Sequence, residues 1–119
     1  MRIQIDFILD NDKQNKYYDM IHNRFIKQYK WYEDDYTDSV VADIPGIKNN
    51  AEAIEYGKKL FMDIAQAISD ESNSIIFVKN LTICVNFIAR NVVPGQPIEY
   101  GEMPEYKDIR VYPKTINHA

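Results

Sequence analysis

The sequence predicts an α+β fold in two layers, with a mainly antiparallel sheet of about five strands and two helices on one face. Several short segments alternate apolar and polar residues, which is the period of a half-buried strand. Two longer segments repeat apolar residues every three or four positions, as amphipathic helices do. The 119 residues, 45% of them hydrophobic and 27% charged, suit one globular domain spanning residues 1–119.

The first strand and the first helix are predicted at the N-terminal end of the chain. Residues 2–9 alternate, which places Ile3 and Phe7 on one side, and the "DND" segment at 10–12 supplies a turn. Residues 13–32 are predicted to be helical because aromatic and aliphatic residues recur along one stripe. The members of that stripe are Tyr18, Ile21, Phe25, Tyr29 and Tyr32.

A short strand and a second helix follow. The acidic run at 33–38 ends the first helix, residues 39–44 form the strand, and Pro45-Gly46 closes it. The second helix is expected over residues 50–69, after an asparagine that can cap its N-terminus. Its apolar side contains Ile54, Gly57, Phe61, Ile64 and Ile68.

The C-terminal third is predicted to add three strands. Residues 74–78 and 81–90 are expected to form a hairpin through a tight connection at 79–80, and residues 108–113 form the last strand. The intervening segment, 91–107, contains three prolines and two glycines, so regular structure is not expected there.

The strand predicted at 81–90 raises the question of what its second face does. Every second residue from Leu81 to Ala89 is apolar and occupies one side, while Asn86 and Arg90 share the other with Thr82, Cys84 and Ile88. Arg110 and Tyr112 also share one face of the last strand. If the two strands are neighbours, these four side chains form a polar floor, and segment 91–107 could close over it as a lid.

Charge and cysteine content restrict the class of protein. The net charge of −4 and the absence of a visible basic stripe argue against a nucleic-acid partner. Cys84 is the only cysteine, so no internal disulfide is expected. The N-terminal apolar run is too short for a bilayer and lacks a signal-peptide pattern. We therefore expect a cytoplasmic protein with no membrane partner.

No arrangement of residues indicates catalysis or a cofactor. Cys84 would need a nearby histidine to act as a nucleophile, and the only candidates are His22 and His118. The acidic run at 33–38 lacks the glycine and the terminal glutamate of a calcium loop. The sequence therefore predicts a protein that is not an enzyme and holds no metal.

Aromatic residues crowd around the first predicted helix, and one buried stripe accommodates only some of them. The remainder either cover the rim of the core or form an interface. Together with an uncovered sheet face, they predict a homo-oligomer. They are Tyr17, Tyr18, Phe25, Tyr29, Trp31, Tyr32 and Tyr36.

A small acidic chain with few arginines, aromatic residues near them and a Pro/Gly-rich loop resembles the first-described type of phage Thoeris anti-defence sponge. Those proteins are oligomers of small α+β protomers that bind cyclic ADP-ribose isomers at a subunit interface without cleaving them. The resemblance implies a small anionic nucleotide as ligand and the host cytoplasm as location. It implies Phe77, Phe87 or Tyr112 for the adenine, Asn86 or Asn91 as an amide contact, and Arg24, Arg90 and Arg110 for the pyrophosphate.

Two other classes of function fit the residues. The acidic and aromatic segment from Trp31 to Asp38 could imitate nucleic acid and inhibit a host nuclease or another defence protein. Alternatively, the chain could be a module whose sheet face only dimerises.

Overall fold

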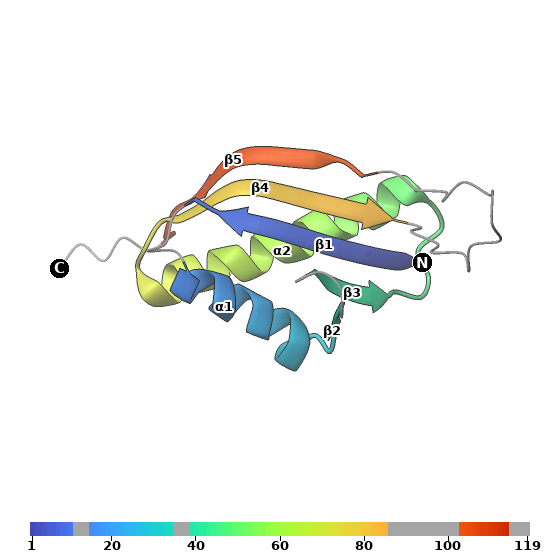
Figure 1. The fold of residues 1–119 in the computed structure, drawn as a ribbon, viewed down its shortest axis with the longest axis horizontal. Coiled ribbons are helices and arrows are strands. Elements are labelled where there is room, and N and C mark those ends of the chain that lie inside the picture. Colours follow the sequence, from blue (N-terminus) through green and yellow to red (C-terminus); the bar gives the residue numbers. More distant parts are fainter. Residues whose placement is uncertain (11–14, 35–38, 86–102, 115–119) are drawn as a thin grey trace, which may run out of the picture.

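The computed structural model describes residues 1–10, 15–34, 39–85 and 103–114. These residues form one antiparallel five-stranded sheet in the order β2-β3-β1-β4-β5, together with two helices (Figure 1). The predicted α+β class is therefore confirmed. The elements are β1 (Arg2–Leu9), α1 (Asn15–Asn23), a π-helical turn η2 (Arg24–Gln28), β2 (Tyr32–Glu33), β3 (Val40–Asp43), α2 (Asn50–Ser72), β4 (Ile76–Val85) and β5 (Glu105–Val111).

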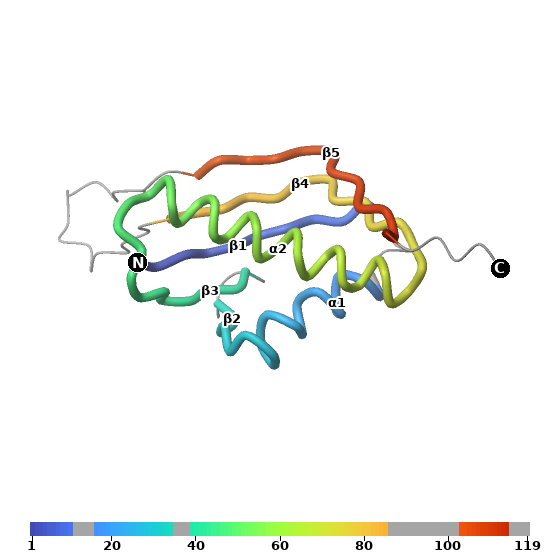
Figure 2. Tube along the Cα trace, turned by 180° about the vertical axis from the view of Figure 1, so that it is seen from behind, coloured from blue at the N-terminus to red at the C-terminus, as the bar shows by residue number. Residues whose placement is uncertain are grey.

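Both helices cover the same face of the sheet. The ring of Phe7 on β1 lies 4.6 Å from the ring of Tyr18 on α1 and 5.2 Å from that of Phe61 on α2, measured between centroids. Figure 2 shows α2 crossing this face along the sheet. Burial of these apolar side chains between the layers is the main stabilising term. The largest fully buried residues are Phe25, Phe61, Ile3, Ile5, Ile21, Ile68, Ile76, Leu81, Ile83, Val40, Val41 and Val78.

Gly57 allows α2 to approach the sheet closely. A Cβ atom at this position would lie 3.3 Å from the Cγ2 atoms of both Ile3 and Ile83. Glycine costs roughly 0.5–1 kcal/mol in a helix relative to alanine, and the close contact with two strands explains its place here.

Gly57→Val is expected to lower the free energy of unfolding by about 1–3 kcal/mol, as overpacking of a filled core does. Urea denaturation followed by circular dichroism measures this change. Ala51→Val on the exposed side of α2 is the matched control, since it carries only the small helix penalty of a β-branched residue. Equal stability of the two variants would show that the contact with the sheet does not limit residue size.

The N-terminus of α2 has the predicted asparagine cap. The Glu52 N–H donates to Asn49 Oδ1 at 2.9 Å, and Glu52 Oε2 accepts from the Lys48 N–H at 3.1 Å. At the other end, Asn73 adopts the left-handed conformation with φ 49°, which asparagine tolerates better than most residues. The helix ends at Ser72 rather than at the predicted residue 69.

The prediction of one long first helix, 13–32, was wrong at its C-terminal end. The α-helix ends at Asn23, the π-turn η2 follows, and Lys30 ends the helix with φ 61°. The Trp31 N–H then donates to the Phe25 carbonyl, six residues earlier, at 2.9 Å, so the bond that closes this end of the helix is one residue wider than the six-to-one bond of a Schellman cap. Residues 13 and 14 lie outside the described ranges.

The same turn reverses the predicted roles of two aromatic residues. Tyr29 belongs to the predicted apolar stripe, yet it is 41% exposed, while Trp31 is only 3% exposed and packs 5.1 Å from Phe25 between ring centroids. The π-turn and the positive φ at Lys30 change the direction of the chain, so the helical period no longer decides which side chain enters the core.

The predicted hairpin at 74–90 is also wrong, because β4 runs without a turn from Ile76 to Val85. Ile8 pairs with Asn80 and Leu9 pairs with Val78, so Lys79 is an extra residue in β4 relative to β1. Such a β-bulge moves the buried positions from even to odd residue numbers while the strand keeps its direction. That switch of parity produces the same sequence pattern as a tight turn.

The sheet has the predicted five strands, but they are not the predicted five. The predicted strands 74–78 and 81–90 are replaced by the single strand β4, and β2, which was not predicted, is the additional strand. β5 begins at Glu105, inside the segment predicted to lack regular structure, and ends at Val111 rather than at residue 113. Residues 86–102 of that region lie outside the described ranges.

Candidate functional site

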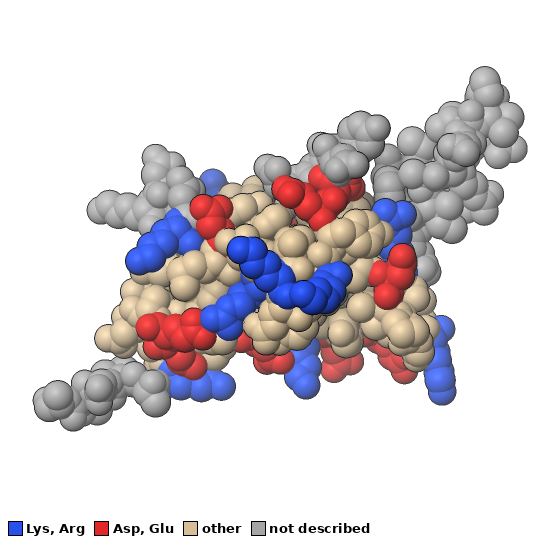
Figure 3. Space-filling model, turned by 90° about the horizontal axis from the view of Figure 1, so that it is seen from below, with Lys and Arg blue, Asp and Glu red and all other residues tan. Residues whose placement is uncertain are grey.

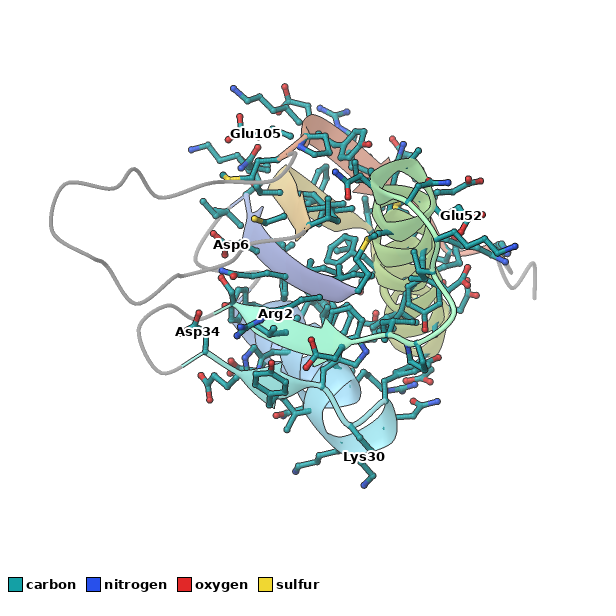
Figure 4. The ribbon with its side chains drawn as sticks, turned by 90° about the vertical axis from the view of Figure 1, so that its right-hand side faces the viewer. Arg2, Asp6, Lys30, Asp34, Glu52 and Glu105 are labelled. Carbon is teal, nitrogen blue, oxygen red and sulfur yellow. The ribbon has the colours of Figure 1, made fainter. Side chains whose placement is uncertain are left out.

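The candidate site lies on the open face, by which we mean the sheet residues that point away from α1 and α2. Figure 4 shows Asp6 and Glu105 on this side of the sheet, while Glu52 projects from the far side of α2. Strand pairing places Asp6, Thr82 and Glu105 in one row across β1, β4 and β5. We predicted that the strand containing residue 81 and the last strand of the chain are neighbours. The pairing of β4 with β5 confirms this for the described residues.

One end of the open face contains two buried apolar side chains. Val41 and Cys84 both pair with Gln4, and both are buried although they lie outside the main core cluster. Burial raises the pKa of the Cys84 thiol, so at neutral pH the thiol stays protonated and is a poor nucleophile.

The other end of the open face holds two of the residues that the resemblance implied as ligand contacts. Phe77 on β4 pairs with Arg110 on β5, and the Arg110 guanidinium carbon lies 5.5 Å from the centroid of the Phe77 ring. This is the geometry of a cation–π contact. We call this pair the Phe77–Arg110 corner.

The corner borders a hollow of about 70 Å³ that is also lined by Asp10, Lys79 and Asp108. Lys79 is the extra residue of the β4 bulge, and Asp108 has φ 55° on the adjacent strand. Bulges of this kind redirect side chains beside functional sites. Sequence reasoning missed these three residues; the switch of buried parity between Val78 and Leu81 was the available signal.

The charges and the volume of the hollow limit what it can hold. Two basic and two acidic side chains line it, so the lining is formally neutral. Within the described part of the chain, Arg24 forms an ion pair with Glu71, His22 Nε2 lies 3.8 Å from Glu33 Oε1, and Arg110 makes no ion pair. Ligand pockets usually measure about 300–1,000 Å³, so this hollow holds one small group of a ligand rather than a whole nucleotide.

Two further predicted residues lie elsewhere. Tyr112 follows β5, its side chain is 55% exposed, and its carbonyl accepts from Gln66 Nε2 at 2.7 Å. Arg24 belongs to η2 in the helical layer and pairs with Glu71 of α2. The structure therefore brings Phe77 and Arg110 together but separates them from Arg24. Asn86, Phe87, Arg90 and Asn91 lie outside the described residues and remain predictions.

Trp31, one of the aromatic residues proposed as an interface contact in the acidic segment 31–38, is buried. Trp31 is part of the core, whereas Tyr32 and Glu33 are exposed on β2. The remainder, 35–38, is not among the described residues. The observations on the described residues do not favour a protein-binding role for this segment.

Comparison with known proteins gives no relative for this chain: no family model, no curated protein and no solved structure matches it. Among the described residues, no group of three or more His, Cys, Asp or Glu side chains could hold a metal ion. Nor does any helix in the described ranges have the length and apolar character needed to cross a membrane.

Proposed function

We propose that this chain is a non-catalytic binding protein that sequesters a small anionic nucleotide, with the Phe77–Arg110 corner as one end of the binding surface. The observation that supports this proposal is the direct contact between an aromatic ring and a guanidinium from two different strands. The resemblance to anti-defence sponges had implied both residues, Phe77 as one of three candidates for the adenine and Arg110 as one of three for the pyrophosphate.

The corner offers the two kinds of contact that a nucleotide needs. A guanidinium that lies over a ring keeps its N–H groups at the edge, where they can donate to a phosphate in pairs. No carboxylate in the described part of the chain occupies these donors. The rest of the ligand would extend over the open face, because the hollow itself is too small for it.

The resemblance to anti-defence sponges supplies a specific ligand for this proposal, a cyclic ADP-ribose isomer, and a role in phage counter-defence. Sponges act as oligomers, and the open face is the surface on which we place a second copy. Light scattering at micromolar concentration should then give at least twice the mass of one 14.0 kDa chain. The mass of a single chain would contradict the proposed oligomer.

Arg110→Ala is expected to weaken binding of a cyclic ADP-ribose isomer by about tenfold or more, since a hydrogen bond to a charged group contributes about 1.5–3 kcal/mol. Isothermal titration calorimetry on wild type and variant measures the affinity. Lys59→Ala is the control, because Lys59 is an exposed cation on α2, which covers the other face of the sheet. Recovery of the intact ligand after heat denaturation tests whether the protein is non-catalytic.

Two results would count against the proposed function. One is the absence of binding heat from the wild-type protein with every isomer tested. The other is an equal loss of affinity in Arg110→Ala and Lys59→Ala, which would show that only net charge matters.

A further inference from the structure

A second hollow lies along the outer side of the first helix, away from the Phe77–Arg110 corner. Its volume is about 300 Å³, and it is lined by Met20, Asn23, Arg24, Lys27 and Gln28. These positions follow the spacing of one helical stripe. The hollow shares no lining residue with the one at the corner, and its volume reaches the range of about 300–1,000 Å³ found for ligand sites.

The chemistry of this hollow is that of a hydrogen-bond donor site. Asn23, Arg24, Lys27 and Gln28 all carry N–H donors, and none of the described lining residues is acidic. Figure 3, which views the molecule from the side of α1, shows Lys and Arg side chains gathered near the middle of this face. The protein is acidic as a whole, with a net charge of −4, so this local excess of basic groups is distinctive.

Glu71 holds the Arg24 guanidinium in a fixed orientation. Both carboxylate oxygens accept from the same nitrogen, Nη2, at 2.6 and 2.5 Å. Within the described part of the chain, Nε and Nη1 make no hydrogen bond, so their N–H groups stay available to a ligand. Fixing a side chain before binding reduces the entropy lost when the ligand arrives.

The backbone beneath the hollow is also unusual. Residues 24–28 form the π-turn η2, in which the Tyr29 N–H donates to the Arg24 carbonyl at 3.2 Å. Such turns within helices occur frequently at functional sites.

We propose that this hollow is a phosphate-binding site, in which Arg24 and Lys27 bind the anion, Asn23 and Gln28 add neutral donors, and Glu71 positions Arg24. The site does not depend on the proposed function, because it uses none of the residues of the corner. Its ligand is either free inorganic phosphate or the phosphate group of a small phosphorylated compound.

The test is titration of the intact protein with inorganic phosphate at low ionic strength. Amide shifts in nuclear magnetic resonance spectra should change mainly at residues 20–28. The fluorescence of Trp31, the only tryptophan, should change as well, because its ring packs on Phe25 of η2. Titrations with adenosine monophosphate and with adenosine separate the two sources: tighter binding of the monophosphate than of phosphate assigns the site to a phosphorylated compound, and equal binding assigns it to free phosphate.

Lys27→Gln is expected to weaken phosphate binding by about tenfold, since it removes a charged donor, and the exposure of Lys27 makes unfolding of the variant unexpected. Arg24→Lys keeps the charge but loses the planar fork, and it should also weaken binding. Lys59→Gln on the exposed side of α2 is the matched control, and Arg110→Ala should retain wild-type affinity.

Three outcomes would overturn this proposal. The first is wild-type affinity in both Lys27→Gln and Arg24→Lys. The second is an equal loss of affinity in Lys59→Gln, with shifts spread over all lysine-bearing segments. The third is binding of adenosine as tight as that of its monophosphate.

Discussion

Phe61→Ala is expected to destabilise the protein by about 3–5 kcal/mol, the usual cost of removing a large aromatic side chain from a core. Phe61 is fully buried and its ring packs against Phe7 of β1. Phe7 also contacts Tyr18 of α1, so a cavity at residue 61 would loosen the junction between the sheet and both helices. Small domains have total stabilities of about 5–15 kcal/mol, which makes this a large fraction.

Chemical denaturation of wild type and Phe61→Ala measures the effect. Lys59→Ala, on the exposed side of the same helix, should change stability by less than about 0.5 kcal/mol. Phe61→Leu should recover part of the loss because it fills part of the cavity. A loss below about 1 kcal/mol in Phe61→Ala would mean that the layers do not pack around this ring.

Trp31→Ala is expected to destabilise the fold by about 3–5 kcal/mol, whereas Tyr29→Ala should cost much less. Trp31 is almost fully buried against Phe25, while Tyr29 is 41% exposed. The indole fills the space next to η2, and its loss would leave a cavity where the chain passes from the helix into β2.

This pair of variants separates two descriptions of the first helix. A continuous helix over 13–32, as its periodicity suggests, would make Tyr29→Ala the more damaging change. The π-turn and the cap at Lys30 make Trp31→Ala the more damaging one. Thermal unfolding of both proteins in the same buffer decides between them, and a larger loss in Tyr29→Ala would contradict the observed turn.

Local periodicity was sufficient to place the regular parts of the fold. β1 has the predicted bounds, β3 lies within the predicted segment, and α2 begins at the predicted residue after its asparagine cap. In these elements one face is buried along the whole length, so the alternation or the helical repeat records burial directly. The α+β class followed from the same pattern.

Periodicity failed where the chain departs from regular geometry. The bulge at Lys79 and the π-turn over residues 24–28 each shift which side chains are buried. In the sequence, the bulge in β4 looks like a tight turn, and the π-turn looks like a continued helical stripe. Tertiary contacts select the observed structure in both cases: β4 pairs with its neighbouring strands, and Trp31 packs against Phe25.

The sequence by itself supplied the residue types of the corner, an aromatic ring and an arginine on the strands, and it gave no sign of the hollow on the first helix. Only the tertiary structure decided which of them meet. Phe77 contacts Arg110 because the register of β4 and β5 pairs them. Arg24 lies away from this pair, because η2 belongs to the helical layer on the other face of the sheet. There Arg24 pairs with Glu71 of α2. A strand period states which side a residue faces, but the neighbour it meets depends on a pairing between distant segments, and no local pattern encodes that pairing.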